Sequence, residues 1–206
     1  MKIWAILVAA GSGRRFGAPK HSVTLDGFEL WQLGRKSLLE GGVDEVVAVG
    51  DMPGGIPGGP RRRDSVAAGL AEVPLDVDFV LVHDAARPLA SPALVRRVID
   101  RLRREDVDGV VPVVPVPDTL KLTLGENVVR TVDRAHLVRA QTPQGFRGEV
   151  LRRAHEVDTA DATDDASMVE GLGGSVATVP GERENLKVTY PEDLDLVRSL
   201  YSARDG

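Results

Sequence analysis

The chain has 206 residues, which suits one domain with a substantial buried core. Its net charge of -5 gives no general reason to expect binding to nucleic acids or membranes, since both attract basic surfaces. Cysteine is absent, which excludes disulfides, thiolate zinc sites and cysteine nucleophiles, and fits a reducing compartment; we expect a cytoplasmic location.

The chain opens with an apolar run, Ile3 to Ala10, that two kinds of segment could produce. A signal peptide would have a basic start such as Lys2, a short apolar core and small residues at a cleavage site. A buried parallel strand also forms a continuous apolar run. We favour the strand, because the basic residues Arg14, Arg15 and Lys20 directly follow the run.

Further strand-like runs alternate with helical patterns along the chain. Apolar runs occupy residues 3–9, 45–50, 78–84, 109–116 and 175–180. Such alternation predicts an α/β protein with a mainly parallel sheet. Because these sheets bind ligands at the carboxyl ends of their strands, the segments to inspect are 10–20, 50–65 and 83–88.

Three helices have recognisable starts. Residues 92–104 have apolar side chains on one face, with Ser91 as the expected N-cap and Pro92 in the first turn. Asp64 is expected to cap a helix over residues 65–73, and Pro191 opens the last helix.

One segment departs from this alternation. Residues 121–124 and 127–132 alternate apolar and polar side chains around a glycine-containing loop, which predicts a β-hairpin. Because an isolated two-stranded hairpin is marginally stable in water, this one should pack on something, and a partner subunit is one candidate.

The turn after the first strand contains Gly11, Gly13 and Gly17. This spacing matches neither the dinucleotide fingerprint nor the Walker P-loop. A glycine-rich turn still offers backbone N–H groups to an anion, and Arg15 and Lys20 add positive charge. We interpret it as a triphosphate cradle; the alternative is a surface turn with solvated arginines.

Two further stretches favour phosphate chemistry. In "VHDAARP", Asp84 ends a strand, where a lone carboxylate suits Mg²⁺ completed by phosphate oxygens. His83 is interpreted as a packed structural residue rather than a zinc ligand, and Arg87 as an ion-pair partner or a phosphate clamp. In "ENLKVTYPEDL", Lys187 stands among apolar neighbours, on an expected short strand before the last helix.

Several polar residues have plainer interpretations. Arg61 to Arg63 are expected to form a solvated basic run on a loop, with a phosphate contact by Arg62 as the alternative. Asp164 and Asp165 suit a helix N-terminus on dipole grounds alone. Thr142, before Pro143, could simply shape a turn.

The series "AAGSGRRFGAPK", "GGPRRRDSVAAGL", "VHDAARP", "DTLK", "TVDR", "TPQ", "ATDDAS" and "ENLKVTYPEDL" resembles the motifs of 2-C-methyl-D-erythritol 4-phosphate cytidylyltransferases, enzymes of the non-mevalonate isoprenoid pathway. The match runs in order over nearly the whole chain. The resemblance implies a Rossmann-like nucleotidyltransferase fold in a single domain, residues 1–206, with a dimerisation arm at about residues 115–135.

The resemblance also implies roles for individual residues. The nucleotide would be held by Ala9, Ala10, Gly11, Ser12, Gly13, Gly59 and Ser65. Catalysis would use Arg15 and Lys20 at the α-phosphorus and Arg134 and Lys187 on methylerythritol phosphate. The remaining contacts to the substrates would come from Asp84, which would also bind Mg²⁺ or another divalent cation, and from Arg87, Thr119, Thr142 and Thr163. The family is dimeric, so Thr119 and Arg134 would reach the neighbouring subunit's site.

The implied reaction is attack of a substrate phosphate oxygen on the α-phosphorus of CTP, with pyrophosphate leaving. No general base is needed, since a phosphomonoester is already mostly dianionic at neutral pH. The neighbouring alternatives are a cytidylyltransferase for ribitol 5-phosphate and a non-catalytic nucleotide-binding protein. His21, Ser22 and Pro60 depart from the usual family pattern and put loop geometry in doubt.

Overall fold

A computed structural model describes residues 1–10, 23–157 and 162–204 of the chain. The helices are α1 (Leu30–Glu40), α2 (Arg62–Glu72), α3 (Pro92–Leu102), α4 (Gly148–Val157), α5 (Asp165–Gly171) and α6 (Pro191–Ser202). The strands are β1 (Ile3–Val8), β2 (Thr24–Leu25), β3 (Phe28–Glu29), β4 (Glu45–Val49), β5 (Phe79–Asp84), β6 (Gly109–Pro115), β7 (Leu120–Leu124), β8 (Asn127–Val132), β9 (Val138–Ala140), β10 (Gln144–Arg147) and β11 (Val176–Pro180). No helix in these ranges is long and apolar enough to cross a membrane.

A seven-stranded sheet organises the described residues, in the order β11-β6-β10-β5-β1-β4, with β9 paired to β6. The expected strands are confirmed, and β11, β6, β5, β1 and β4 run in one direction. The sheet is nevertheless mixed, because the unpredicted strand β10 runs antiparallel between β5 and β6, and β9 is antiparallel to β6.

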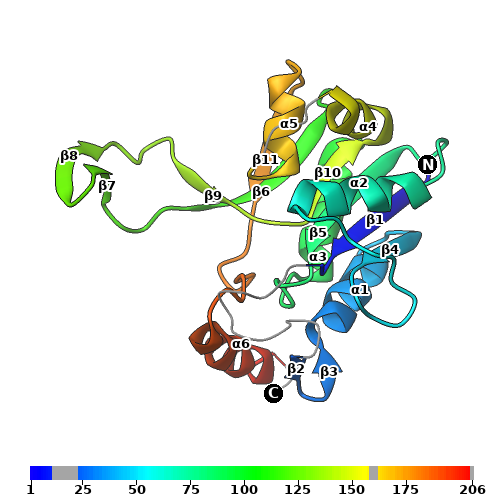
Figure 1. The fold of residues 1–206 in the computed structure, drawn as a ribbon, viewed down its shortest axis with the longest axis horizontal. Helices are drawn as coiled ribbons and strands as arrows, with labels where there is room; N and C mark the ends of the chain where they lie inside the picture. Colours follow the sequence, from blue (N-terminus) through cyan, green and yellow to red (C-terminus); the bar gives the residue numbers. More distant parts are fainter. Residues whose placement is uncertain (11–22, 158–161, 205–206) are drawn as a thin grey trace.

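Helices cover both faces of this sheet (Figure 1). One apolar cluster joins α1 and α3 to the sheet, and a second joins α2, α4 and α5 to the other face. The run predicted as a strand is β1, whose Ala5 packs in the first cluster and Ile6 in the second, both fully buried. Burial on both faces explains why this strand has no polar alternation.

Two of the three predicted helix starts are confirmed, those of α3 and of α6, which begins at Pro191. In α3 the Ser91 hydroxyl accepts the Leu94 N–H at 3.0 Å and Pro92 occupies the first turn, as predicted. The predicted cap at Asp64 is wrong: α2 already begins at Arg62, and Asp64 lies in its first turn. The Asp64 carboxylate instead accepts the Arg61 N–H at 3.2 Å, an interaction that stabilises the same helix end from within.

The predicted hairpin is confirmed as β7 and β8, which form an arm that projects away from the sheet (Figure 1). Most of its side chains are exposed, including Leu122, Leu124, Val128 and Val129. Exposed apolar residues on a two-stranded hairpin are the feature expected of a surface that packs against another molecule.

Candidate active site

The expected nucleotide-binding residues fall into two groups. Gly11, Ser12, Gly13, Arg15 and Lys20 lie outside the described residues. Ala9 and Ala10 follow β1, and the structure brings them beside the loop that contains Gly59 and precedes α2.

At Gly58 that loop passes directly beside Ala10, just after the end of β1. A Cβ on Gly58 would collide with the Cβ of Ala10, and the Gly59 N–H donates to the Ser65 hydroxyl at 3.1 Å. The predicted residues at the carboxyl ends of β1 and β4 are therefore assembled next to each other.

Asp84 ends β5, directly beside the end of β1, where Val8 is its register partner. Its carboxylate accepts the Arg62 Nε–H at 3.0 Å and the Lys187 Nζ–H at 2.6 Å, and the residue is only 7% exposed. Burial alone would raise the pKa of Asp84, but the charges of Arg62 and Lys187 outweigh it and hold that pKa well below its usual range. The carboxylate is therefore ionised at neutral pH.

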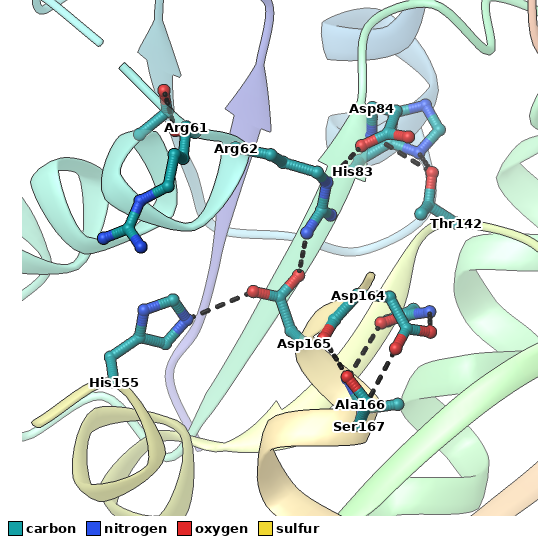
Figure 2. Close-up of polar contacts among 12 residues, drawn as sticks. Arg61, Arg62, His83, Asp84, Thr142, His155, Asp164, Asp165, Ala166 and Ser167 are labelled. Carbon is teal, nitrogen blue, oxygen red and sulfur yellow. Dashed lines mark hydrogen bonds and ion pairs between the residues drawn. The ribbon is translucent and has the colours of Figure 1, made fainter. Parts of the chain in front are cut away.

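The interpretation of Arg61 to Arg63 as a solvated loop is wrong for two of the three. Arg63 is 7% exposed and donates to the His155 carbonyl at 3.0 Å. Arg62 starts α2 and bridges Asp84 to Asp165, whose carboxylate is 2.7 Å from Nη1 (Figure 2). Both side chains point inward: Arg62 reaches β5 and α5, and Arg63 reaches α4, on which α2 packs.

His83 is packed and hydrogen-bonded, as predicted. It is fully buried, with Nε2 3.2 Å from the Arg87 carbonyl oxygen and Nδ1 2.9 Å from the Thr142 hydroxyl. The Asp84 N–H also donates to that hydroxyl, at 3.0 Å (Figure 2). Thr142, which precedes a cis peptide bond to Pro143, therefore links β5 to the start of β10 in addition to shaping a turn.

Lys187 reaches Asp84 from an irregular segment, so the predicted short strand is wrong. The segment is held to β5 by its neighbours: the Val188 N–H donates to the Ala86 carbonyl at 2.8 Å, and Arg87 donates to the Asn185 carbonyl at 2.8 Å. The hydrogen bonds of the Arg87 guanidinium thus go to the backbone carbonyls of Asn185 and Ala140. Within the described ranges, no carboxylate is among its hydrogen-bond partners.

The other expected substrate contacts are spread out. Thr163 is exposed, just before α5. Thr119 and Arg134 are exposed on the arm, at the start of β7 and the end of β8, and the Arg134 guanidinium donates to the Val116 carbonyl at 3.2 Å. The arm on which these two residues stand projects away from the sheet whose strand β5 ends in Asp84 (Figure 1).

Asp165 and His155 are members of the cluster that the sequence pattern does not place there. The pattern indicates only a helix-dipole role for Asp165, and this residue does stand at the start of α5, after the N-cap Asp164. Its ion pair with Arg62 joins residues 103 positions apart, so no local pattern indicates it.

The family model for 2-C-methyl-D-erythritol 4-phosphate cytidylyltransferase matches residues 3–201. A bifunctional enzyme IspD/IspF of Granulibacter bethesdensis is 44% identical over 217 residues, which cover 98% of this chain and 57% of that protein. This chain thus spans little more than half of that relative. The 2-C-methyl-D-erythritol 4-phosphate cytidylyltransferase of Rubrobacter xylanophilus is 40% identical over 221 residues, 98% of this chain and 95% of that one.

Solved structures agree with these sequence matches. The crystal structure of 2-C-methyl-D-erythritol 4-phosphate cytidylyltransferase from Thermus thermophilus superposes with a TM-score of 0.82 at 35% identity, over 96% of this chain and 98% of that one. The bifunctional protein of Campylobacter jejuni gives the same TM-score, 0.82, at 29% identity, over 95% of this chain and 54% of that one. The expected Rossmann-like nucleotidyltransferase architecture is confirmed.

Proposed function

The chain belongs to the 2-C-methyl-D-erythritol 4-phosphate cytidylyltransferase family, and we propose that it transfers the cytidylyl group of CTP to 2-C-methyl-D-erythritol 4-phosphate. The observation that supports this most directly is Asp84, ionised between Arg62 and Lys187 next to the end of β1, the strand end that the glycine loop also approaches at Ala10. We further propose that residues 1–206 form one nucleotidyltransferase domain, in the cytoplasm, with the arm at about residues 115–135.

In this reaction a phosphate oxygen of methylerythritol phosphate forms a bond to the α-phosphorus of CTP. The bond from that phosphorus to the bridging oxygen of the β-phosphate breaks, and pyrophosphate leaves with the electron pair. The products are 4-diphosphocytidyl-2-C-methyl-D-erythritol and pyrophosphate. The attacking phosphate is mostly dianionic at neutral pH, so the chain needs no general base; its task is to align two polyanions and offset their repulsion.

The nucleotide would lie against the backbone of Ala9 to Gly13, the loop with Gly59, and Ser65 in the first turns of α2. Support for the second half of this site comes from the close approach of that loop to Ala10 and the Gly59–Ser65 hydrogen bond of 3.1 Å. Arg15 and Lys20 would stabilise charge at the α-phosphorus.

Lys187, Arg87, Thr142 and Thr163 would contact methylerythritol phosphate. The Lys187 side chain is 41% exposed and its ammonium has three donors, so it can hold Asp84 and still present N–H groups to a phosphate. The Thr142 hydroxyl contacts the backbone N–H of Asp84 and the His83 ring, which places Thr142 at the same end of β5.

Asp84 fits a divalent cation of the kind that takes one protein carboxylate and completes its shell with phosphate oxygens and water. The donor set is suitable, because the carboxylate is ionised and its two oxygens accept more bonds than the two that Arg62 and Lys187 supply. When bound, Mg²⁺ would neutralise phosphate charge.

We propose that two chains form a homodimer through the arm. The exposed apolar residues of β7 and β8 supply a surface that needs covering, and Thr119 and Arg134 of each arm would complete the other chain's site. The projection of the arm away from its own sheet supports this arrangement (Figure 1).

Pyrophosphate release tests the function. The chain is assayed with CTP, Mg²⁺ and methylerythritol phosphate, and in parallel with ATP and with ribitol 5-phosphate. The proposal is supported if pyrophosphate is released with CTP and methylerythritol phosphate and with no other pair. Release with ribitol 5-phosphate instead would show that the substrate is a different alcohol phosphate. Arg15→Ala should then lower kcat on the order of 10²–10³-fold, by analogy with loss of one transition-state donor. Arg153→Ala, an exposed arginine on α4, is the control that should keep its rate.

A further inference from the structure

Asp165 is a fully buried carboxylate next to the proposed site. It accepts hydrogen bonds from Arg62 Nη1 at 2.7 Å and from His155 Nε2 at 3.1 Å (Figure 2). Burial alone would raise the pKa of Asp165, but the hydrogen bond from His155 and the charge of Arg62 outweigh it and keep the pKa low. Asp165 is therefore a fixed negative charge.

Arg62 connects Asp165 to Asp84, because its guanidinium contacts both carboxylates. Its guanidinium is planar, so the Nη1 bond to Asp165 and the Nε bond of 3.0 Å to Asp84 orient one rigid group from two sides. Lys187 holds the other oxygen of Asp84, at 2.6 Å. The Asp84 carboxylate thus has both oxygens restrained, and one restraint ends on Asp165.

A structural role alone gives a weaker account of this arrangement. Buried ion pairs contribute little net stability compared with apolar residues of similar volume, because desolvation offsets the attraction. Here the buried pair of Arg62 from α2 and Asp165 from α5 leads to the carboxylate that ends β5 at the proposed site. His155 of α4 contacts Asp165 from the other side, so three helices contribute to the arrangement that orients Asp84.

We propose that Asp165 is a positioning residue of the reaction: supported by His155, it fixes the guanidinium of Arg62, which in turn fixes the carboxylate of Asp84. This inference rests on the proposed function. It predicts that Asp165 contributes to kcat/KM only while Arg62 is present, because Asp165 acts on Asp84 through the Arg62 guanidinium.

The test is a double-mutant cycle on Asp165→Asn and Arg62→Gln. Asp165→Asn keeps the size of the side chain and removes its charge, and should lower kcat/KM on the order of 10- to 100-fold, as loss of supporting partners does at other sites. Arg62→Gln should lose as much or more. The double variant should be no slower than Arg62→Gln alone, whereas independent structural damage would multiply the two losses.

A second readout does not depend on activity. The Nε–H resonance of Arg62 in free protein, assigned with Arg62→Lys, should be distinct in the wild type and should shift or broaden in Asp165→Asn. Asp108→Asn is the matched control: this carboxylate accepts the Ser175 N–H at 2.8 Å at the amino end of β6, so the variant should lose stability but keep both the resonance and kcat/KM.

If Asp165→Asn does not fold, two variants of His155 test the inference in its place. His155→Gln retains a donor for Asp165 and should stay close to wild type, while His155→Phe should lower kcat/KM and perturb the Arg62 resonance. Multiplying losses, wild-type kinetics in Asp165→Asn, or an unchanged Arg62 resonance would overturn the inference. Failure of the proposed function is a separate result: folded wild-type protein would release no pyrophosphate from CTP and methylerythritol phosphate.

Discussion

Burial of His83 makes the stability of this protein depend on pH above the range where carboxylates titrate. The ring contacts the Thr142 hydroxyl and the Arg87 carbonyl, an arrangement that suits a neutral imidazole with the proton on Nε2. Burial lowers the pKa of His83 to about 4; the negative charge of Asp84 opposes this shift, and the positive charge of Arg87 adds to it. Between the folded and unfolded pKa values, the unfolded chain binds more protons, so lowering the pH favours unfolding.

A lowering from 6.5 to about 4 corresponds to roughly 3 kcal/mol of stability that is complete above the unfolded pKa and lost as pH falls toward the folded one. About 2 kcal/mol of this loss falls between about pH 7.5 and about pH 5. Within that window few carboxylates titrate in either state, so the histidine contribution is measured nearly alone.

Urea unfolding of wild type and His83→Gln at several pH values, in EDTA, measures this contribution. The free energy of unfolding of the wild type should fall more steeply with acidification than that of the variant, by about 2 kcal/mol over the window. Val98→Ala is the control, because it creates a cavity at the buried face of α3 without changing a titratable group. It should lower the free energy of unfolding by a similar amount at every pH, so that the dependence on pH keeps the wild-type slope. Parallel curves for wild type and His83→Gln would refute the reasoning.

Three further changes have defined outcomes. Gly145→Val should lower the free energy of unfolding in urea by about 1–3 kcal/mol, because a Cβ there would lie 2.7 Å from Leu102 Cδ1, whereas Gly171→Ala, with open space around its Cβ, should be near neutral. Leu124→Asp, an exposed change on the arm, should convert a dimer to a monomer in sedimentation analysis while leaving the monomer's thermal midpoint unchanged; a persistent dimer would exclude the arm as the interface. Lys187→Gln should lower kcat/KM on the order of 10²-fold by removing the cation at the proposed phosphate site, and unchanged kinetics would count against that role.

Most strands of the sheet can be predicted from the sequence, because a strand that is buried on both faces has an uninterrupted run of apolar residues. Residues 3–9 and 79–82 are continuous apolar runs, and the structure buries both faces of β1 and all of β5. The start of α3 was also local, since Ser91 caps the N–H three residues on. Strand β10 is not predicted because it has only four residues, two of them polar, and its burial comes from distant segments: the strands β5 and β6 beside it and the helices α3 and α4 above and below it.

The sequence predicts several of the residues of the site, but not the contacts that they make with one another. Asp84 and Lys187 were identified as candidates from their positions, yet their contact joins residues 103 apart and depends on an irregular segment docking on β5. The same holds for Arg62, which reads as part of an exposed basic run. Its inward direction is set by where α2 begins, two residues before the expected cap. Pairings between distant segments follow from packing, which a local pattern does not contain.

Charge balance around Asp84 explains what the rest of the site must supply. Lys187 and Arg62 are positive, Asp84 and Asp165 negative, so these four ionised groups form a neutral set that costs less to bury than an excess of cations would. A neutral set orients groups but gives little net attraction for a triphosphate. In a chain of net charge -5, that attraction has to come from cations outside the set, which is the role proposed for Arg15 and Lys20 and for a divalent cation on Asp84, while Arg134 is proposed to attract methylerythritol phosphate. Their loss should therefore weaken phosphate binding, whereas loss of Asp165 should misplace Asp84.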